Sequence, residues 1–283
     1  MASSTATAAL ALFAVGLAAA PLRGARAASL IQGPVGGAFL TSDIAYPGQF
    51  PWHAAVHKAG EDANSLLGSG ALVSQMFVLS AASIIPADLT GVELEVVLGI
   101  VSLRQAGSKV SVGQVKKHDQ WTSANPRVDD LALLQLATSV ELTDVIALVA
   151  LPPWYYRGAT YKDLSVSVSS WGAESPDYKD MFLREVIADV ISNRDCQKES
   201  GVKMEPTQLC AHQSADDQDV VLGAFDGGDP AVFIEPSGVA RLIGIMSAEK
   251  QQGPSNSQKP AVMARITEHL AWIAANSDAD IGG

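Results

Sequence analysis

Short apolar runs alternate with turn residues along most of the chain from about residue 52. Runs of about five to eight residues at this spacing, without a long helical period between them, are typical of antiparallel sandwiches and barrels. The pattern predicts strands at 71–73, 77–82, 94–103, 109–115, 131–136, 164–169, 182–191, 230–234 and 240–246. We therefore expect an all-β fold.

The last apolar residues of the chain follow a different period. They recur at helical spacing, at Ile266, Leu270, Ile273 and Ala274. Such a stripe belongs to a helix that packs on a core, so we expect one C-terminal helix. The segment 143–161 contains Pro152, Pro153 and Gly158, and these residues indicate a seam between two halves of the fold.

An apolar run near the N-terminus has the features of a secretory signal. It covers residues 8–20, which is shorter than the ~20 residues that span a bilayer. Pro21 follows it, and Ala25-Arg26-Ala27 supplies the small residues of a signal-peptidase site. We expect residues 1–27 to be a signal peptide and the mature chain to be secreted and extracellular. A short hydrophobic anchor is the alternative, since the first residues lack Lys and Arg.

The composition narrows the function classes. The chain has 283 residues, of which 48% are hydrophobic and 17% charged, enough for one large domain or two small ones. Its 30 acidic and 19 basic residues give a net charge of −11. Loss of residues 1–27 removes two arginines, so 17 basic residues remain and the charge becomes −13. A chain this acidic is not expected to bind nucleic acid or an anionic membrane.

The sequence offers no metal or cofactor motif. Two cysteines cannot build a disulfide-dense scaffold or a four-thiolate zinc site, and no HExxH motif is present. The five histidines are His53, His57, His118, His212 and His269. None lies beside a Ser or Cys in a recognisable nucleophile motif, and we expect them on the surface. We expect no metal site and no cofactor.

Seven segments, in order along the chain, resemble the chymotrypsin-like (trypsin-fold, S1) serine peptidases. They are YPGQFPWHAAV at 46–56, GSGALVSQMFVLSAAS at 68–83, DDLALLQL at 129–136, SSWG at 169–172, VISNRDC and TQLCA within 190–211, FDGGDP at 225–230 and LIGIMS at 242–247. The resemblance covers about 39–273. It implies two six-stranded antiparallel β-barrels, an active-site cleft between them and a C-terminal helix packed on one barrel.

The resemblance also implies the domain boundaries. A short segment at 28–38 precedes one peptidase S1-like domain at 39–276. We expect its N-terminal barrel at about 39–150, its C-terminal barrel at about 151–264 and its terminal helix at about 265–276.

Two of the three catalytic positions implied by the resemblance hold unsuited residues. The family needs a serine nucleophile, a histidine base and an aspartate that orients the histidine. The segment that matches TAAHC reads SAASI and puts Ser83 at the histidine position, and FDGGDP puts Gly227 at the nucleophile. A serine is not a general base near neutral pH, and glycine has no side chain to attack with. Asp130 matches the third position, where a hydrogen-bonded structural remnant is the alternative interpretation.

The oxyanion loop and the activation site also depart from the family. The loop positions are Phe225, Asp226 and Gly227, and Phe225 stands where the family has its first glycine. Asp229 replaces the last glycine. Residues 28–39 contain no Lys or Arg, so we expect Asp226 to lack the ammonium group that cleavage supplies in the family. We expect it to be partly solvated or paired with another group.

The specificity positions implied by the resemblance hold Val221, Ala248 and Glu249. The acid that selects Arg or Lys in trypsin-type enzymes is absent from them. No primary pocket for a peptide side chain can be read from these residues.

Cys196 and Cys210 match one recurrent disulfide of the family. A secreted chain favours their oxidation, and a closed loop of this size contributes ~3 kcal/mol in the chain-entropy model. Two free buried thiols are the alternative.

These departures lead to a functional hypothesis. We expect a secreted serine protease homologue that is not an enzyme and that acts by binding a protein partner. The resemblance implies that such a partner is a protease, an inhibitor or another component of a protease cascade, in immunity or in reproductive secretions, and that the homologue serves as cofactor, decoy or regulator. The alternatives are a residual serine-type endopeptidase that uses unconventional residues, and a passive secretory protein.

Overall fold

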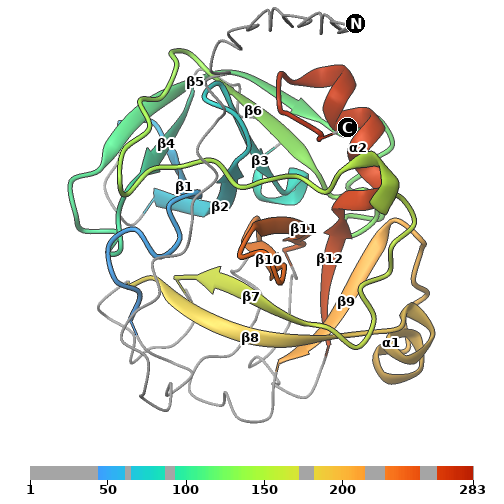
Figure 1. The fold of residues 1–283 in the computed structure, drawn as a ribbon. Coiled ribbons are helices and arrows are strands. Elements are labelled where there is room, and N and C mark those ends of the chain that lie inside the picture. Colours follow the sequence, from blue (N-terminus) through green and yellow to red (C-terminus); the bar gives the residue numbers. More distant parts are fainter. Residues whose placement is uncertain are drawn as a thin grey trace, which may run out of the picture.

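The computed structural model describes residues 44–60, 65–86, 93–171, 182–213, 227–248 and 260–282. Within these ranges the chain forms two closed six-stranded antiparallel barrels and a short C-terminal helix (Figure 1). The expected fold class is therefore confirmed. The signal peptide, the 28–38 segment and the positions Val221, Phe225, Asp226 and Glu249 lie outside the described residues.

The first barrel closes through its first strand, which pairs with both the second and the fourth. The strands, in the order in which they are bonded, are β1 (His53–Lys58), β2 (Leu66–Leu72), β3 (Phe77–Ser80), β6 (Ala132–Leu136), β5 (Ser108–Lys117) and β4 (Leu94–Leu98). The expected strand at 94–103 is shorter in the structure. It ends at Leu98 because Gly99 adopts φ +74, a turn conformation that extended residues do not have.

The second barrel is built the same way from the later part of the chain. Its strands, in bonded order, are β10 (Pro230–Ile234), β11 (Ala240–Met246), β12 (Ala261–Arg265), β9 (Gln208–Gln213), β8 (Arg184–Ile191) and β7 (Ser165–Ser170), and β7 closes on β10. The chain crosses between the barrels within 137–164, the stretch that holds the expected seam at 143–161.

The apolar pattern missed three of the described strands, β1, β9 and β12, of which β1 was expected only as the entry strand implied by the family resemblance. β9 and β12 are short and have a bonded strand on each side, and β9 carries Gln208, His212 and Gln213 among its six residues. A strand that mixes buried polar and small residues has no clean period-two signal, so tertiary pairing decides its structure.

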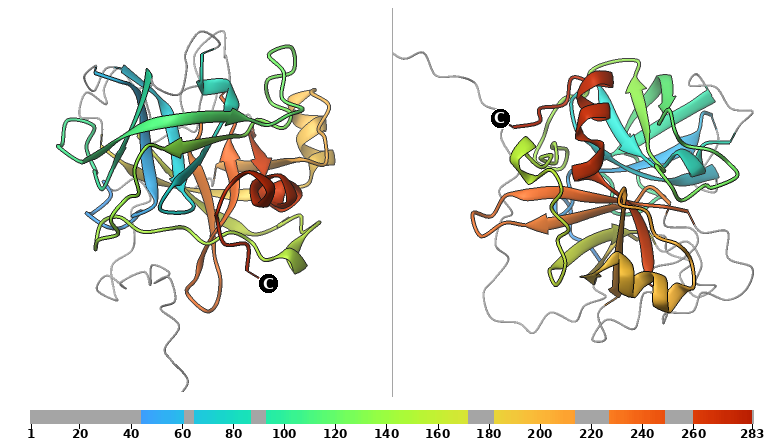
Figure 2. Two further views of the ribbon diagram at one scale, coloured as in Figure 1. Left: turned by 90° about the horizontal axis from the view of Figure 1, so that it is seen from above. Right: turned by 90° about the vertical axis from the view of Figure 1, so that its right-hand side faces the viewer.

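The helices lie at the edges of the barrels. α1 (Asn193–Ser200) begins at Ser192, whose Oγ accepts a hydrogen bond from the backbone N–H of Asp195 at 3.1 Å. It ends at Gly201, which has φ +70. α2 (Ile266–Asn276) follows β12 directly and lies beside the first barrel, near the short 3₁₀ helix η4 (Trp154–Tyr156) (Figure 2). No helix in the described ranges is long and apolar enough to cross a membrane.

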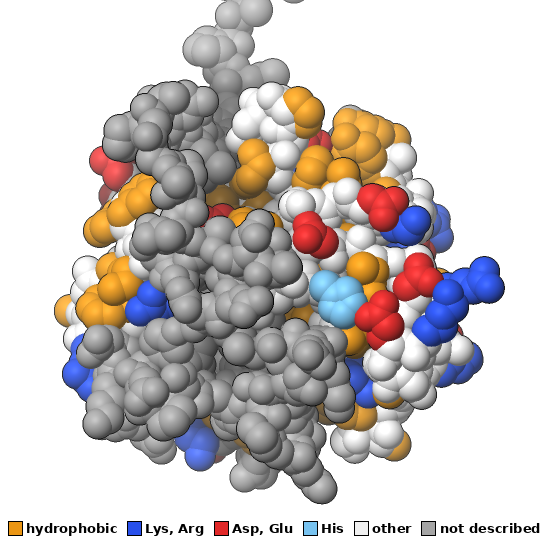
Figure 3. All heavy atoms as spheres, turned by 90° about the horizontal axis from the view of Figure 1, so that it is seen from below, with side chains coloured by type: hydrophobic (Ala, Val, Ile, Leu, Met, Phe, Trp, Pro, Cys, Tyr) orange, Lys and Arg blue, Asp and Glu red, His pale blue; other side chains and the backbone are white. Residues whose placement is uncertain are grey.

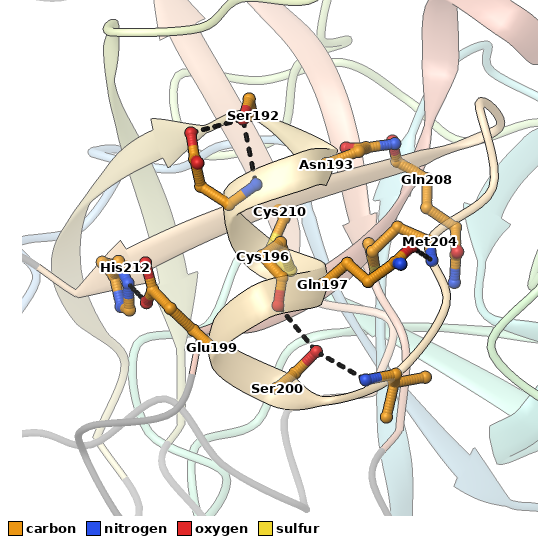
Figure 4. Close-up of a disulfide and its surroundings, with 12 residues drawn as sticks. Ser192, Asn193, Cys196, Gln197, Glu199, Ser200, Met204, Gln208, Cys210 and His212 are labelled. Atoms are coloured by element: carbon orange, nitrogen blue, oxygen red, sulfur yellow. Dashed lines mark hydrogen bonds and ion pairs between the residues drawn. A yellow bond between two sulfur atoms is a disulfide. The ribbon is translucent and has the colours of Figure 1, made fainter.

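A disulfide joins α1 to β9, as expected from Cys196 and Cys210, and the alternative of two free thiols is excluded (Figure 4). Both cysteines are buried. On the right-hand part of the face seen from below, acidic and basic side chains lie next to one another (Figure 3). Ion pairs in and near α1 join Lys198 to Asp195 and Lys203 to Glu205.

One apolar cluster extends across both barrels and the C-terminal helix. It includes Leu72 and Leu134 from the first barrel, Leu242 and Ile245 from β11, and Leu270 from α2, each no more than 1% exposed. Burial of shared apolar area fixes the two barrels against each other. The polar residues along their seam are therefore held at defined distances.

Candidate functional site

The seam between the barrels brings together three segments that are far apart in the chain. The 3₁₀ helix η2 (Ala82–Ile84) follows β3 and carries Ser83, Asp130 precedes β6, and Gly227 precedes β10. The backbone N–H of Ser69 in β2 donates to the carbonyl oxygen of Gly227 at 3.0 Å. The first barrel thus contacts the turn of the second through main-chain atoms.

Ser83 and Asp130 are joined by two hydrogen bonds. The backbone N–H of Ser83 donates to one carboxylate oxygen of Asp130 at 2.7 Å, and its hydroxyl donates to the other at 2.7 Å. Asp130 is 0% exposed, whereas Ser83 is partly exposed. This contact brings together two of the positions that the resemblance implied for a catalytic site, whose catalytic role stays a prediction.

Burial raises the pKa of Asp130 from an ordinary value of 3.8 to about 6, and the hydrogen bonds from Ser83 oppose this rise only in part. A carboxylate with this pKa has nearly the basicity of a free imidazole, whose reference value is about 6.5. The pair therefore combines a hydroxyl with a base that already accepts its proton in a hydrogen bond.

The residue before Asp130 ties the pair to the C-terminal helix. Asp129 adopts φ +51, which is rare for a residue with a side chain, and its carboxylate lies 3.1 Å from Nε2 of His269 in α2. This hydrogen bond is the main reason why the pKa of Asp129 lies below its usual range. The contact to α2 stabilises the unusual backbone that turns Asp130 inward.

Gly227 is buried, and the space beside it is filled. A Cβ atom built on this residue would lie 2.6 Å from Cγ2 of Ile84 and 2.8 Å from Cβ of Ala248. Real Cβ atoms do not approach that closely, so a serine at 227 requires its neighbours to move. Of the specificity positions, Ala248 is the described one, and it packs here. The remaining oxyanion and specificity assignments stay predictions.

A second polar cluster lies in the seam, and sequence reasoning missed it. His53 Nδ1 lies 2.6 Å from Ser169 Oγ, and His53 Nε2 lies 3.7 Å from Asp229 Oδ1. Burial lowers the pKa of His53 to about 3. The signal in the sequence was Asp229 itself, because an acid in place of a glycine next to a buried turn needs a polar partner.

The expectation that the histidines lie on the surface is wrong for three of them. His53, His57 and His269 are 2%, 5% and 2% exposed, because β1 is covered on both faces and His269 points into the seam toward Asp129. His212 is partly exposed and pairs with Glu199 of α1 (Figure 4). In the described part of the chain, no group of three or more His, Cys, Asp or Glu side chains is placed to hold a metal ion.

The chain is similar to known proteins over most of its length. The family model described as Trypsin matches residues 41–273. The proclotting enzyme of Tachypleus tridentatus is 28% identical over 244 residues, which cover 80% of this chain and 63% of that protein. Trypsin delta of Drosophila erecta is 27% identical over 237 residues, covering 81% and 84%. Chymotrypsin-C of Mus musculus is 25% identical over 240 residues, covering 81% and 85%.

These comparisons correct one expectation. The hypothesis that the chain is not an enzyme, drawn from Ser83 and Gly227, is contradicted, because its relatives are named as trypsins, a chymotrypsin and a proclotting enzyme. The hydrogen-bonded His53 and Ser169 add residue types of serine hydrolysis that the motif comparison overlooked. The hypothesis was wrong because it considered only the positions at which the family motifs place catalytic residues.

The pKa of Asp130 predicts a pH-dependent stability. Since the folded-state pKa is raised, the contribution of Asp130 is fully present below about pH 4 and is lost as the pH rises through about 6. We expect the parent to lose about 3 kcal/mol of unfolding free energy between these pH values, and we expect Asp130→Asn not to show this loss. Urea unfolding of both proteins from pH 3.5 to 8 measures it. The exposed control Asp119→Asn should follow the parent curve, and identical curves for Asp130→Asn and the parent would show that the carboxyl is not shifted.

Packing around Gly227 predicts the cost of a serine there. We expect Gly227→Ser to lower the unfolding free energy by about 2 kcal/mol, the usual cost of overpacking. The loss should shrink by half or more in an Ile84→Ala background, because Cγ2 of Ile84 makes the closest contact. The control is Gly113→Ser, where the nearest atom to the new Cβ is 3.6 Å away. Equal losses in both backgrounds would contradict the packing argument.

Proposed function

Because the chain belongs to the trypsin family, whose model matches residues 41–273, we propose that it binds polypeptides where its two barrels meet and cleaves them with a residual serine-type endopeptidase activity. The observation that supports this most directly is the Ser83–Asp130 pair. It offers a partly exposed hydroxyl hydrogen-bonded to a carboxylate of raised pKa in the seam.

The proposed reaction follows serine-type acyl transfer. The Oγ atom of Ser83 forms a bond to the scissile carbonyl carbon while Asp130 takes its proton. The bond from that carbon to the amide nitrogen then breaks, and the proton passes from Asp130 to the leaving amine. Water adds to the acyl group in the same way, with Asp130 as base, and frees Ser83.

The expected rate is low. Enzymes of this kind that lose triad members keep ~10³–10⁴-fold acceleration over water, from binding and the oxyanion hole. We expect an acceleration in the same range from a hydroxyl that has a carboxylate as its base and no imidazole between the two. The activity is therefore proposed as residual when set against a complete triad.

An extracellular location is part of the proposal. It is supported by the signal-like segment at 1–27 and by the Cys196–Cys210 disulfide, because disulfides persist in oxidising compartments.

A second candidate function is regulation by binding. The observation in its favour is the burial of Gly227 beneath Ile84 and Ala248, because a polypeptide in the seam then meets an apolar surface where the family has its nucleophile. Slow turnover would prolong such a complex. A protease, an inhibitor or another cascade component is the proposed partner, with this chain as cofactor, decoy or regulator.

The endopeptidase proposal predicts a labelled serine. A fluorophosphonate probe and a casein digest should detect slow labelling and turnover by the mature chain. Both signals should fall at least tenfold in Ser83→Ala, because the attacking oxygen is lost. The exposed control Ser108→Ala should leave them unchanged. Mass spectrometry should place the label on Ser83. A label on Ser169 would assign the reaction to the buried cluster, and neither label nor turnover would refute the endopeptidase.

The binding proposal predicts partners that depend on the same seam. Crosslinking and mass spectrometry in the native fluid should capture a protein with the parent chain. Ser83→Tyr should lower its yield about tenfold, because a ring would fill the space beside Asp130. Ser108→Tyr, on the exposed side of β5, is the matched control. Equal yields from all three would favour the passive secretory protein.

A further inference from the structure

His269 is a buried histidine of α2 that faces a hydrogen-bond acceptor with each of its ring nitrogens. Nδ1 lies 2.7 Å from the carbonyl oxygen of Arg265, four residues earlier, and Nε2 lies 3.1 Å from Oδ1 of Asp129. The exposed fractions of His269 and Asp129 are 2% and 5%. A lone pair on either nitrogen would be repelled by the oxygen that it faces, and in a buried place water does not weaken this repulsion.

The two contacts determine how many hydrogens the ring carries. A backbone carbonyl only accepts, so Nδ1 must donate to Arg265. The hydrogen bond with His269 holds the pKa of Asp129 below its usual range in spite of burial, and Thr207 lowers it further. This group is therefore a carboxylate, which also only accepts, and Nε2 must donate as well. A neutral imidazole has a single N–H, so neither of its tautomers satisfies both contacts.

The other ionisable groups around the ring are compatible with one positive charge at His269. His118, which follows β5, meets the ring edge-on with ring centres 5.0 Å apart. Burial lowers the pKa of His118, and the charge on His269 lowers it further. The guanidinium of Arg265 donates to a carbonyl oxygen of β9 at 2.7 Å, and Glu268, the neighbour of His269 on α2, is partly exposed. The acid that pairs with the ring is Asp129.

Asp129 connects this histidine to the Ser83–Asp130 pair. Its φ of +51 is rare for a residue with a side chain, and its carbonyl accepts a hydrogen bond from the N–H of Leu131 at 2.8 Å. Asp130 lies at the apex of this tight turn, where it accepts two hydrogen bonds from Ser83. An unusual backbone persists only when its surroundings hold it. His269 supplies such a hold from α2.

We propose that His269 is a positioning residue for the Ser83–Asp130 pair: it holds Asp129 while both of its ring nitrogens carry a hydrogen, and it releases Asp129 when rising pH removes one of them. Imidazoles lose a proton to solvent close to neutral pH. The ring then turns a lone pair toward the carboxylate or toward the carbonyl, and that contact opens. The effect of His269 on cleavage rests on the proposed endopeptidase, whereas its hold on Asp129 does not.

Titration of Asp130 and of His269 predicts a bell-shaped pH profile for the labelling of Ser83 by a fluorophosphonate probe. The rate should rise through about pH 6, where Asp130 becomes a base. It should fall again about fivefold toward pH 8.5, as the hold on Asp129 is lost.

Amide hydrogen exchange provides a second readout, which does not depend on turnover. Protection of the Leu131 amide, corrected for the intrinsic effect of pH, should fall about fivefold between pH 6 and pH 8.5, because the turn at Asp130 opens more often. Protection of the Val190 amide, which donates to Leu164 in the second barrel at 2.9 Å, should not fall in this way.

His269→Gln and His269→Leu separate this role from packing. Glutamine keeps an N–H donor for Asp129 and does not titrate. It should preserve the rise through pH 6 and abolish both the alkaline fall and the pH-dependent exchange at Leu131. Leucine has no donor, so fast exchange at Leu131 should be present at every pH. The matched control His212→Gln changes the partly exposed pair with Glu199 and should reproduce the parent in both measurements.

An alkaline fall or a loss of Leu131 protection that persists in His269→Gln would overturn the proposal, as would unchanged Leu131 protection in the parent. If His269→Leu does not fold, the comparison of the parent with His269→Gln decides. If Ser83 in the parent takes no label at any pH, the proposed endopeptidase fails, and exchange at Leu131 then tests the hold on Asp129. The two proposals therefore fail separately.

Discussion

The close approach of two main chains at the barrel seam constrains everything around it. Gly228 has φ +89, and a Cβ there would lie 1.9 Å from the carbonyl oxygen of Ser69. That carbonyl also accepts a hydrogen bond from the Ser80 hydroxyl at 2.5 Å, so it cannot retreat without losing this bond. Glycine is required at 228 both by its backbone angle and by space. The turn that carries Gly227 and Asp229 is consequently pressed against β2.

This contact explains the site that results. With the turn so near η2, the volume that a side chain at 227 would occupy is taken by Ile84 and Ala248. Ser83 is much smaller than a histidine, yet its backbone N–H and its hydroxyl both reach Asp130. One small residue therefore supplies two hydrogen bonds to the buried carboxyl. The hydroxyl of Ser83 and the carboxyl of Asp130 both lie on the first barrel, while Ile84 of the first barrel and Ala248 of the second form an apolar wall beside Gly227.

The sequence predicted those parts of the fold in which local pattern and burial agree. In β8, Val186, Ala188 and Val190 alternate with less buried neighbours, and the stripe of α2 faces the core through Leu270 and Ile273. The strands β9 and β12 were not predicted because they lack an alternating apolar pattern, and pairing with the strands on both sides determines their structure. At the site, motif order located Ser83 and Asp130, whereas the raised pKa of Asp130 depends on burial that only the folded chain reveals.

The buried histidine of β1 illustrates a limit of motif reasoning and a way past it. His53 is followed by two alanines and a valine that are 0% exposed. The strand is therefore buried on both faces, and a polar residue in it needs a polar partner. Asp229 poses the complementary problem. Pro230, which follows it, has no N–H to donate, and Gly228 has no side chain. The carboxylate of Asp229 is 1% exposed, and His53 Nε2 lies 3.7 Å from its Oδ1 across the seam. Two residues far apart in the chain thus meet in the buried seam, and a motif confined to one segment cannot reveal such a meeting.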